Sequence, residues 1–247
     1  MRLVIRITLL ILAIVLSGTA GASSQIDDPL PSADDIAARM MRADVQRRAE
    51  MTGYSAVRRY VAANRDRRAE MVVRVDCSSE GAKQFTIISE NGSSSIRKHV
   101  FHKILSEESD ASRRDSREGT RVTPANYIFN IVGRETLDSG PAYVLSIIPK
   151  TENKYLINGK IWVNARDYSI VRIEGRPARN PSFWVHDVHF VHTYQRVGQF
   201  WFASSTHTTS EIRIFGSSEL TIEDSDYVLN TLKEATPAAE SLARLVR

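Results

Sequence analysis

Residues 155–175 read YLINGKIWVNARDYSIVRIEG, and this stretch decides the fold class. Short apolar runs stand on either side of Asn158-Gly159, which is the strongest short-range hairpin signal because both central positions of the favoured turn need positive φ. We therefore predict a hairpin that turns at Asn158-Gly159. A further strand is predicted over 168–174, ending at Gly175.

Short apolar runs separated by turn residues continue on both sides of this stretch. A second hairpin is predicted around Val197-Gly198. Connections are short and no helical pattern lies between the later strands, which excludes a parallel α/β sheet. An antiparallel meander that curls into a barrel or half-barrel is expected instead. The other predicted strands are 69–76, 83–90, 127–132, 142–148, 184–194, 200–209, 211–215 and 219–228.

Two helices are predicted before the meander. The first covers 35–51, with Ser32 or Asp34 as its cap, and its apolar residues near helical spacing are Ile36, Met40, Met41 and Val45. The second starts at Ser94 or Ser95. The apolar stripe of the second is formed by Ile96, Val100, Phe101, Ile104 and Leu105. With a short C-terminal helix as a third candidate, the expected fold is α+β, mainly antiparallel β, with two or three helices covering the sheet.

Residues 1–22 have the pattern of a cleavable secretory signal. Arg2 and Arg6 precede an apolar run over 7–16, and small residues end at Ala20-Gly21-Ala22. A membrane anchor is the alternative, but a spanning helix needs roughly 20 apolar residues. We expect cleavage after Ala22, export, and no stable membrane span afterwards. The remaining chain then divides into a flexible leader (23–32), one domain (33–232) and a C-terminal tail (233–247).

Charge and cysteine content restrict the function classes. The chain has 33 Lys and Arg against 29 Asp and Glu; removing the two arginines of the signal leaves 31 against 29, or +2. The richest basic stretches, 58–68 and 113–121, are interleaved with acids and are interpreted as solvated surface, so nucleic-acid binding is not expected. Cys77 is the single cysteine, which excludes an internal disulfide and predicts a structural thiol.

Motifs for nucleophilic and phosphate chemistry are missing from the sequence. There is no G-x-S-x-G, H-E-x-x-H or P-loop. Ser95-Ile-Arg-Lys98 matches S-x-x-K without its companion motifs, so a helix cap explains it better. Glu107 and Glu108 lie in a charged helical tail, 107–119, whose expected role is solvated surface. We predict a protein that is not an enzyme and uses no cofactor.

Histidines are the remaining candidates for a metal site. His186 and His192 are separated by roughly 20 Å along one strand, and His189 points to the other face. Pairing around Val197-Gly198 is expected to put His207 opposite Val188 and diagonal to His186. No acid or cysteine completes a ligand set there, so no metal site is predicted.

The strands of the long hairpin over 184–209 have no plainly polar face. A sheet with one wet face usually alternates cleanly between apolar and polar side chains. A curved sheet that lines a cavity departs from this rule, and so does an ordinary sandwich core. The pattern leaves both readings open.

The order of elements over 54–229, and residues 155–175 above all, resembles the LolA-like superfamily of bacterial outer-membrane lipoprotein-sorting proteins, which includes LolB and RseB. The resemblance implies an unclosed, half-open β-barrel with helices as a lid. It also implies a periplasmic location in the bacterial envelope and an apolar cavity that holds lipoprotein acyl chains.

We therefore predict a non-catalytic periplasmic binding or carrier protein for lipid or lipoprotein acyl chains, with a role in outer-membrane lipoprotein sorting. The alternative is an envelope sensor or regulatory domain of the same fold that binds a protein partner. Strand positions nominate four aromatic side chains as lining residues of the cavity: Phe129, Trp162, Phe190 and Trp201.

Overall fold

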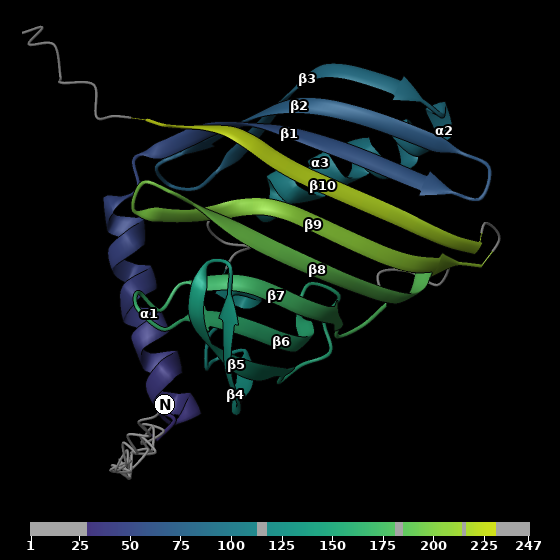
Figure 1. The fold of residues 1–247 in the computed structure, drawn as a ribbon. Helices are drawn as coiled ribbons and strands as arrows, with labels where there is room; N and C mark the ends of the chain where they lie inside the picture. Colours follow the sequence, from purple (N-terminus) through teal and green to yellow (C-terminus); the bar gives the residue numbers. More distant parts are fainter. Residues whose placement is uncertain (1–28, 113–117, 181–184, 214–215, 231–247) are drawn as a thin grey trace, which may run out of the picture. The chain divides into compact units, whose positions relative to one another are not determined.

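Ten strands pair edge to edge in one antiparallel sheet in the described part of the chain, in the order β3-β2-β1-β10-β9-β8-β7-β6-β5-β4 (Figure 1). The order ends at β3 and β4, so the sheet is unclosed, and the predicted mainly antiparallel α+β fold class is confirmed. The strands are β1 (Gly53–Asn64), β2 (Arg68–Ser78), β3 (Lys83–Gly92), β4 (Tyr127–Leu137), β5 (Gly140–Pro149), β6 (Ile157–Asn164), β7 (Ile170–Pro177), β8 (Val185–Val197), β9 (Phe200–Ile212) and β10 (Gly216–Leu229).

The structure is a computed structural model that describes residues 29–112, 118–180, 185–213 and 216–230. The predicted signal sequence, most of the predicted leader and the predicted C-terminal tail lie outside these residues. The unit described below starts at Pro31.

Helix α1 (Ala33–Glu50) begins two residues before the predicted start at 35 and ends one residue before the predicted end at 51. Ser32 is its cap, and the hydroxyl of Ser32 accepts a hydrogen bond from the backbone N–H of Asp35 at 3.1 Å. Ile36 and Met40, one turn apart, are buried against β4–β7. Their spacing places both side chains on the helix face that packs against the sheet.

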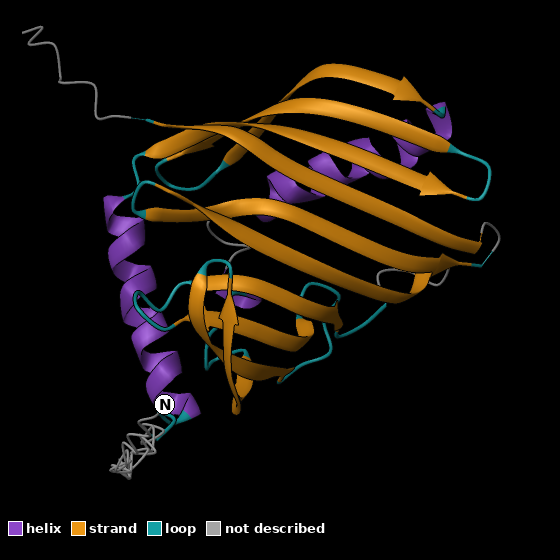
Figure 2. Cartoon of the chain, in the orientation of Figure 1, coloured by secondary structure: helices purple, strands orange, loops and turns teal. Residues whose placement is uncertain are grey.

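The second helical segment has three parts: α2 (Ser94–Ile96), a π-helical turn η1 (Arg97–Phe101) and α3 (His102–Ala111). Its cap is Ser93, one residue before the predicted Ser94. A π turn holds one residue more than an α turn, so Phe101 falls on the same side as Ile96, five residues earlier. Figure 2 shows this segment beneath the arching strands, where Ile96, Phe101 and Leu105 are buried.

The predicted turn at Asn158-Gly159 is wrong, because both residues lie inside β6. Gly159 pairs with Gly175 of β7, and a Cβ built on Gly159 would come within 2.1 Å of the carbonyl oxygen of Glu174. These glycines serve a close approach of two backbones rather than a turn. The chain reverses after Asn164 instead, at Tyr168, whose φ is +55°.

The β8–β9 hairpin turns beside the predicted Val197-Gly198, and Gly198 has a φ of +62°. Its register differs from the prediction: His207 lies opposite Val191, not Val188, and His186 lies opposite Glu211. Irregular pairing at two places in β8 shifts the alignment, which a uniform strand pattern does not reveal. The expected diagonal approach of His186 and His207 is therefore absent. β9 also continues to Ile212, through the start of the separate strand predicted over 211–215.

One row of paired residues crosses nine strands and defines a single face of the sheet, because directly paired residues point to the same side. The apolar ends of this row lie under α3 and α1, and its middle members are the polar Thr206 and His192. We call this side the helix-covered face. The row is Met71, Tyr60, Ile222, Thr206, His192, Ile173, Ile161, Leu145 and Ile131.

Candidate functional site

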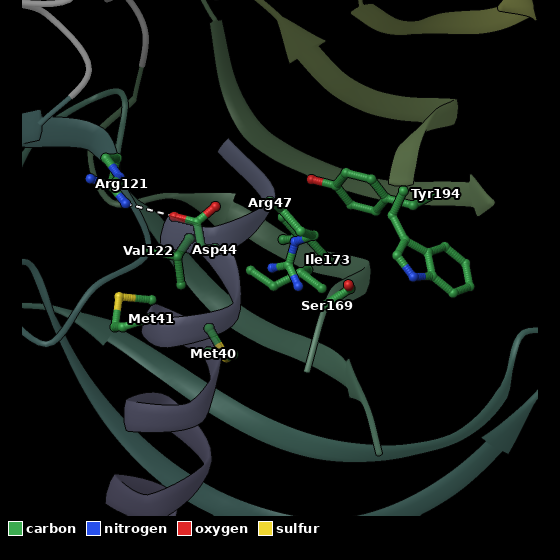
Figure 3. A pocket seen from close by; sticks show the side chains of 11 residues that line it. Met40, Met41, Asp44, Arg47, Arg121, Val122, Ser169, Ile173 and Tyr194 are labelled. Atoms are coloured by element: carbon green, nitrogen blue, oxygen red, sulfur yellow. Dashed lines mark hydrogen bonds and ion pairs between the residues drawn. The ribbon is translucent and has the colours of Figure 1, made fainter. Parts of the chain in front are cut away.

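Two cavities open on the helix-covered face, and both are lined by Tyr194 and Trp201. The α1 cavity has a volume of about 290 Å³ (Figure 3). The central cavity has a volume of about 430 Å³. The other residues of the α1 cavity are Met40, Met41, Asp44, Arg47, Arg121, Val122, Ser169, Ile170 and Ile173. Those of the central cavity are Tyr54, Arg58, Lys83, Glu108, His192, Phe202, Ala203, Thr206, Ile222 and Asp224.

An ion-pair cluster forms one wall of the central cavity. Arg58 on β1 donates from Nε to the carboxylate of Asp224 at 2.6 Å and from Nη1 to that of Glu108 at 2.8 Å. Lys83 donates to the same Glu108 carboxylate at 2.6 Å. The cluster joins β1, β3, β10 and α3, so four elements depend on one set of charges.

Burial and ion pairing oppose each other in this cluster. Burial alone would raise the pKa of Glu108, but Lys83 and Arg58 lower it to about 2. Burial raises the pKa of Asp224 above its ordinary value, against the opposing effect of Arg58. Burial lowers the pKa of Arg58, but Glu108 and Asp224 more than compensate and raise it. Two cations and two acids therefore neutralise each other at the cavity wall.

The sequence reading of Arg58 and Glu108 as solvated surface is wrong. Arg58 is only 6% exposed, and the side chain of Glu108 is 26% exposed. Both positions are in phase with buried neighbours: Arg58 stands two residues before Tyr60, and Glu108 three after Leu105. This spacing from buried residues was the signal in the sequence that both charged side chains face the core. A charged residue in phase with a core face needs a partner, and the partners here are distant in sequence.

His192 lies between the two helices on the same face. Its Nδ1 is hydrogen-bonded to the hydroxyl of Thr206, and its ring meets Tyr194 edge-on at 4.6 Å between centroids. Burial, together with the nearby cations Arg58 and Lys83, lowers the pKa of His192 to about 4. The imidazole is thus neutral at neutral pH, and it adds no charge to the central cavity.

The α1 cavity has charged groups at its rim. Arg121 pairs with Asp44 at 2.6 Å, as the dashed line in Figure 3 marks. The indole N–H of Trp201 donates to Asp167 at 2.8 Å. Although burial opposes it, this bond and the backbone N–H of Ser169 lower the pKa of Asp167, which stays ionised.

Of the four predicted aromatic residues, Trp201 lines both cavities. Phe129 is buried in the core under α1, and Phe190 packs against that core. Trp162 lines neither cavity and belongs to a separate cluster with Val144, against which Trp201 also packs. Sequence position could not tell the two faces apart, because consecutive residues of a strand alternate between them.

Comparisons with solved structures find likenesses across most of the chain. The fold is similar to a DUF1329 family protein from Desulfovibrio piger, with a TM-score of 0.45, 12% identity, and coverage of 82% of this chain and 95% of that one. A domain from Vibrio parahaemolyticus assigned as an outer-membrane lipoprotein-sorting protein has a TM-score of 0.39 and 13% identity, with coverage of 83% of this chain and 98% of that one. A LolA superfamily protein from Nitrosomonas europaea has a TM-score of 0.37 and 11% identity, with coverage of 82% of this chain and 96% of that one.

At such identities each likeness concerns the fold alone. No protein-family model and no curated protein matches the sequence. Within the described ranges no three His, Cys, Asp or Glu side chains gather as a metal site requires, and no helix there is long and apolar enough to cross a membrane. What the site can do must therefore be argued from its own side chains.

Proposed function

We propose that this protein binds lipid or lipoprotein acyl chains on the helix-covered face, as a periplasmic carrier that performs no chemical step. The observation that carries the proposal is the hollow middle of this face. The core is filled under α1 and under α3, whereas the stretch between them keeps two cavities. Their volumes are near or within the range of roughly 300–1,000 Å³ typical of small-molecule sites.

The lining suits a long apolar group. Trp201 and Tyr194 are shared by the two cavities, and Ile173 and Phe202 extend the apolar surface on either side. Burying an acyl chain is favourable by about 0.8 kcal/mol per CH₂. The charged groups of the central cavity neutralise one another, so they stabilise the wall without needing to react with a ligand.

A direct test is lipid analysis of the protein made with residues 1–22 in a bacterial host and purified from the periplasm. Mass spectrometry should find a bound acyl lipid at near-stoichiometric amount. Failure of the protein to reach the periplasm would contradict the predicted signal. Lipid-free protein that also takes up no acyl probe would contradict the carrier function.

Two tryptophans provide a matched pair for the binding measurement. The Trp201→Ala variant removes one of the two side chains common to both cavities, whereas Trp162→Ala removes a tryptophan that lines neither cavity. With N-phenylnaphthylamine as a neutral apolar probe, we expect Trp201→Ala to weaken binding about tenfold or more, and Trp162→Ala to leave it within about twofold. Circular dichroism checks that both variants are folded.

A second candidate function, an envelope sensor that binds a protein partner, rests on the two edges of the sheet. Edge strand β3 exposes Ile87 and Ile88, and edge strand β4 exposes Ile128 and Val132. Unpaired edges can accept a further strand. A photo-crosslinker at position 132 should then capture one envelope protein in cells, while a crosslinker at the exposed Asp66 captures none. No capture at 132 would count against the sensor.

A further inference from the structure

Arg47, in the last turn of α1, is a cation that pairs with no carboxylate in the described part of the chain. Its neighbours Arg48 and Arg121 both pair with Asp44, at 3.1 and 2.6 Å. Among the described residues no carboxylate oxygen lies within 4.0 Å of the Arg47 guanidinium. With the described residues it forms one hydrogen bond, from Nη1 to the backbone carbonyl of Asp167 at 3.2 Å.

A structural role accounts for only part of this arrangement. A basic residue in the last turn of a helix interacts favourably with the helix dipole, and the bond to Asp167 ties α1 to the β6–β7 turn. A guanidinium has five N–H donors, however, and burial lowers the pKa of Arg47 although Asp44 and Asp167 oppose the shift. A partly desolvated cation with free donors is costly unless an anion joins it.

The surroundings of Arg47 are those of an amphiphile site. Figure 3 draws the guanidinium among the side chains that line the α1 cavity, of which Met40, Val122, Ile170 and Ile173 are apolar. The hydroxyl of Ser169, 2% exposed, lines the same cavity and has no partner of acceptable hydrogen-bond geometry in the described residues. A guanidinium with spare donors and a buried hydroxyl therefore accompany an apolar wall.

We propose, resting on the acyl-binding function above, that the ligand of the α1 cavity is a free fatty acid whose carboxylate pairs with Arg47 and whose chain lies against Ile170 and Ile173. One unpaired cation calls for a monoanion, and the planar guanidinium matches a carboxylate. The ester- and amide-linked chains of a lipoprotein have no charge there and would leave Arg47 unpaired. A cavity of about 290 Å³ suits one chain rather than several.

The test compares head groups on one chain length by displacement of N-phenylnaphthylamine, below the micelle concentrations. Laurate should bind roughly tenfold or more tightly than uncharged 1-monolaurin, and dodecyltrimethylammonium should bind least. The Arg47→Gln variant should weaken laurate binding roughly tenfold and leave monolaurin unchanged. Arg42→Gln is the matched control, since Arg42 is exposed on the same helix and lines neither cavity.

The salt dependence of laurate affinity tests the ion pair without any variant. Laurate affinity of the unaltered protein should fall between 20 and about 500 mM NaCl, and monolaurin affinity should not, because only an ion pair is screened. Equal affinity for laurate and monolaurin, or laurate binding that ignores both salt and Arg47→Gln, would overturn the fatty acid while leaving acyl binding intact. Displacement by none of the three amphiphiles would overturn both proposals.

Discussion

Arg58 and Glu108 lie fifty residues apart in sequence, and their side chains meet at 2.8 Å between β1 and α3. Arg58 also reaches Asp224 on β10 and so connects the first and last strands of the chain with the helix that covers them. The contact is the polar end of an otherwise apolar interface, because Phe101 and Leu105 of the same helical segment are buried on these strands. Holding α3 in place thus depends on a charge pair as well as on packing.

Glu108→Gln should lower the free energy of unfolding by about 3 kcal/mol, since it leaves Arg58 buried with one acid instead of two. Denaturant unfolding followed by circular dichroism measures the change. Glu107→Gln is the control: the side chain of Glu107 is 44% exposed and stands 3.7 Å from Lys154, so a change below about 0.5 kcal/mol is expected. Equal effects of the two variants would mean that the pair with Arg58 contributes little.

His192 should make the protein less stable as the pH falls from about 6.5. Its pKa is about 4 in the folded protein, against 6.5 as the ordinary value, so between these limits the unfolded chain binds the proton more readily. The full effect is about 3 kcal/mol. Glu108 acts in the same direction only at lower pH, because a carboxyl lowered to about 2 loses its contribution below about 4.5.

The pH range from 7.5 to 5 therefore separates the effect of the histidine from that of Glu108. In that range His192→Gln should flatten the decline of the denaturation midpoint. The control His99→Gln, at an exposed position of the π-helical turn, should retain it. A decline that His192→Gln leaves unaltered would assign the pH dependence to other groups.

Gly159→Ala should destabilise the sheet by about 3 kcal/mol, because the added Cβ would sit 2.1 Å from a backbone oxygen of β7 that cannot move without breaking the ladder. Thermal unfolding gives the comparison. Gly119→Ala introduces the same group where no heavy atom lies within 4 Å, and its melting temperature should match that of the unaltered protein within a few degrees. A tolerated Gly159→Ala would contradict the close approach.

Ile36→Ala should cost about 3 kcal/mol, since Ile36 is fully buried between α1 and the sheet. Val45→Ala, at a 61% exposed position of the same helix, should change stability by less than about 0.5 kcal/mol. Urea unfolding of the two variants measures whether Ile36, and not Val45, attaches α1 to the sheet. Comparable losses would indicate that the helix contacts the sheet differently.

Local patterns predicted much of the architecture. Ser32 and the Ile36 and Met40 spacing located α1, the stripe from Ile96 to Leu105 located the second helical segment, and the succession of short apolar runs predicted an antiparallel sheet. These features depend on residues within one or two turns of each other, where spacing determines which side chains share a face.

The candidate site was predicted less well, because short-range spacing says nothing about contacts between distant strands. Trp201 lines the cavities but Trp162 does not, and only the pairing of the whole sheet tells which face of each strand the helices cover. Asn158-Gly159 matched a turn signal, yet β7 needed glycine for a close crossing. In each case a distant strand decided between two local readings.

The sequence by itself determined the antiparallel sheet and its two covering helices, because each depends on neighbouring residues, whereas the export signal over 1–22 stays a prediction. Tertiary structure alone decided that Arg58 and Glu108 are partners and that Arg47 pairs with no carboxylate of the described residues. The physical reason is that the residues next to a charged side chain in the sequence indicate only a solvated position for it. Whether it is paired or buried depends on side chains that the fold brings from far away.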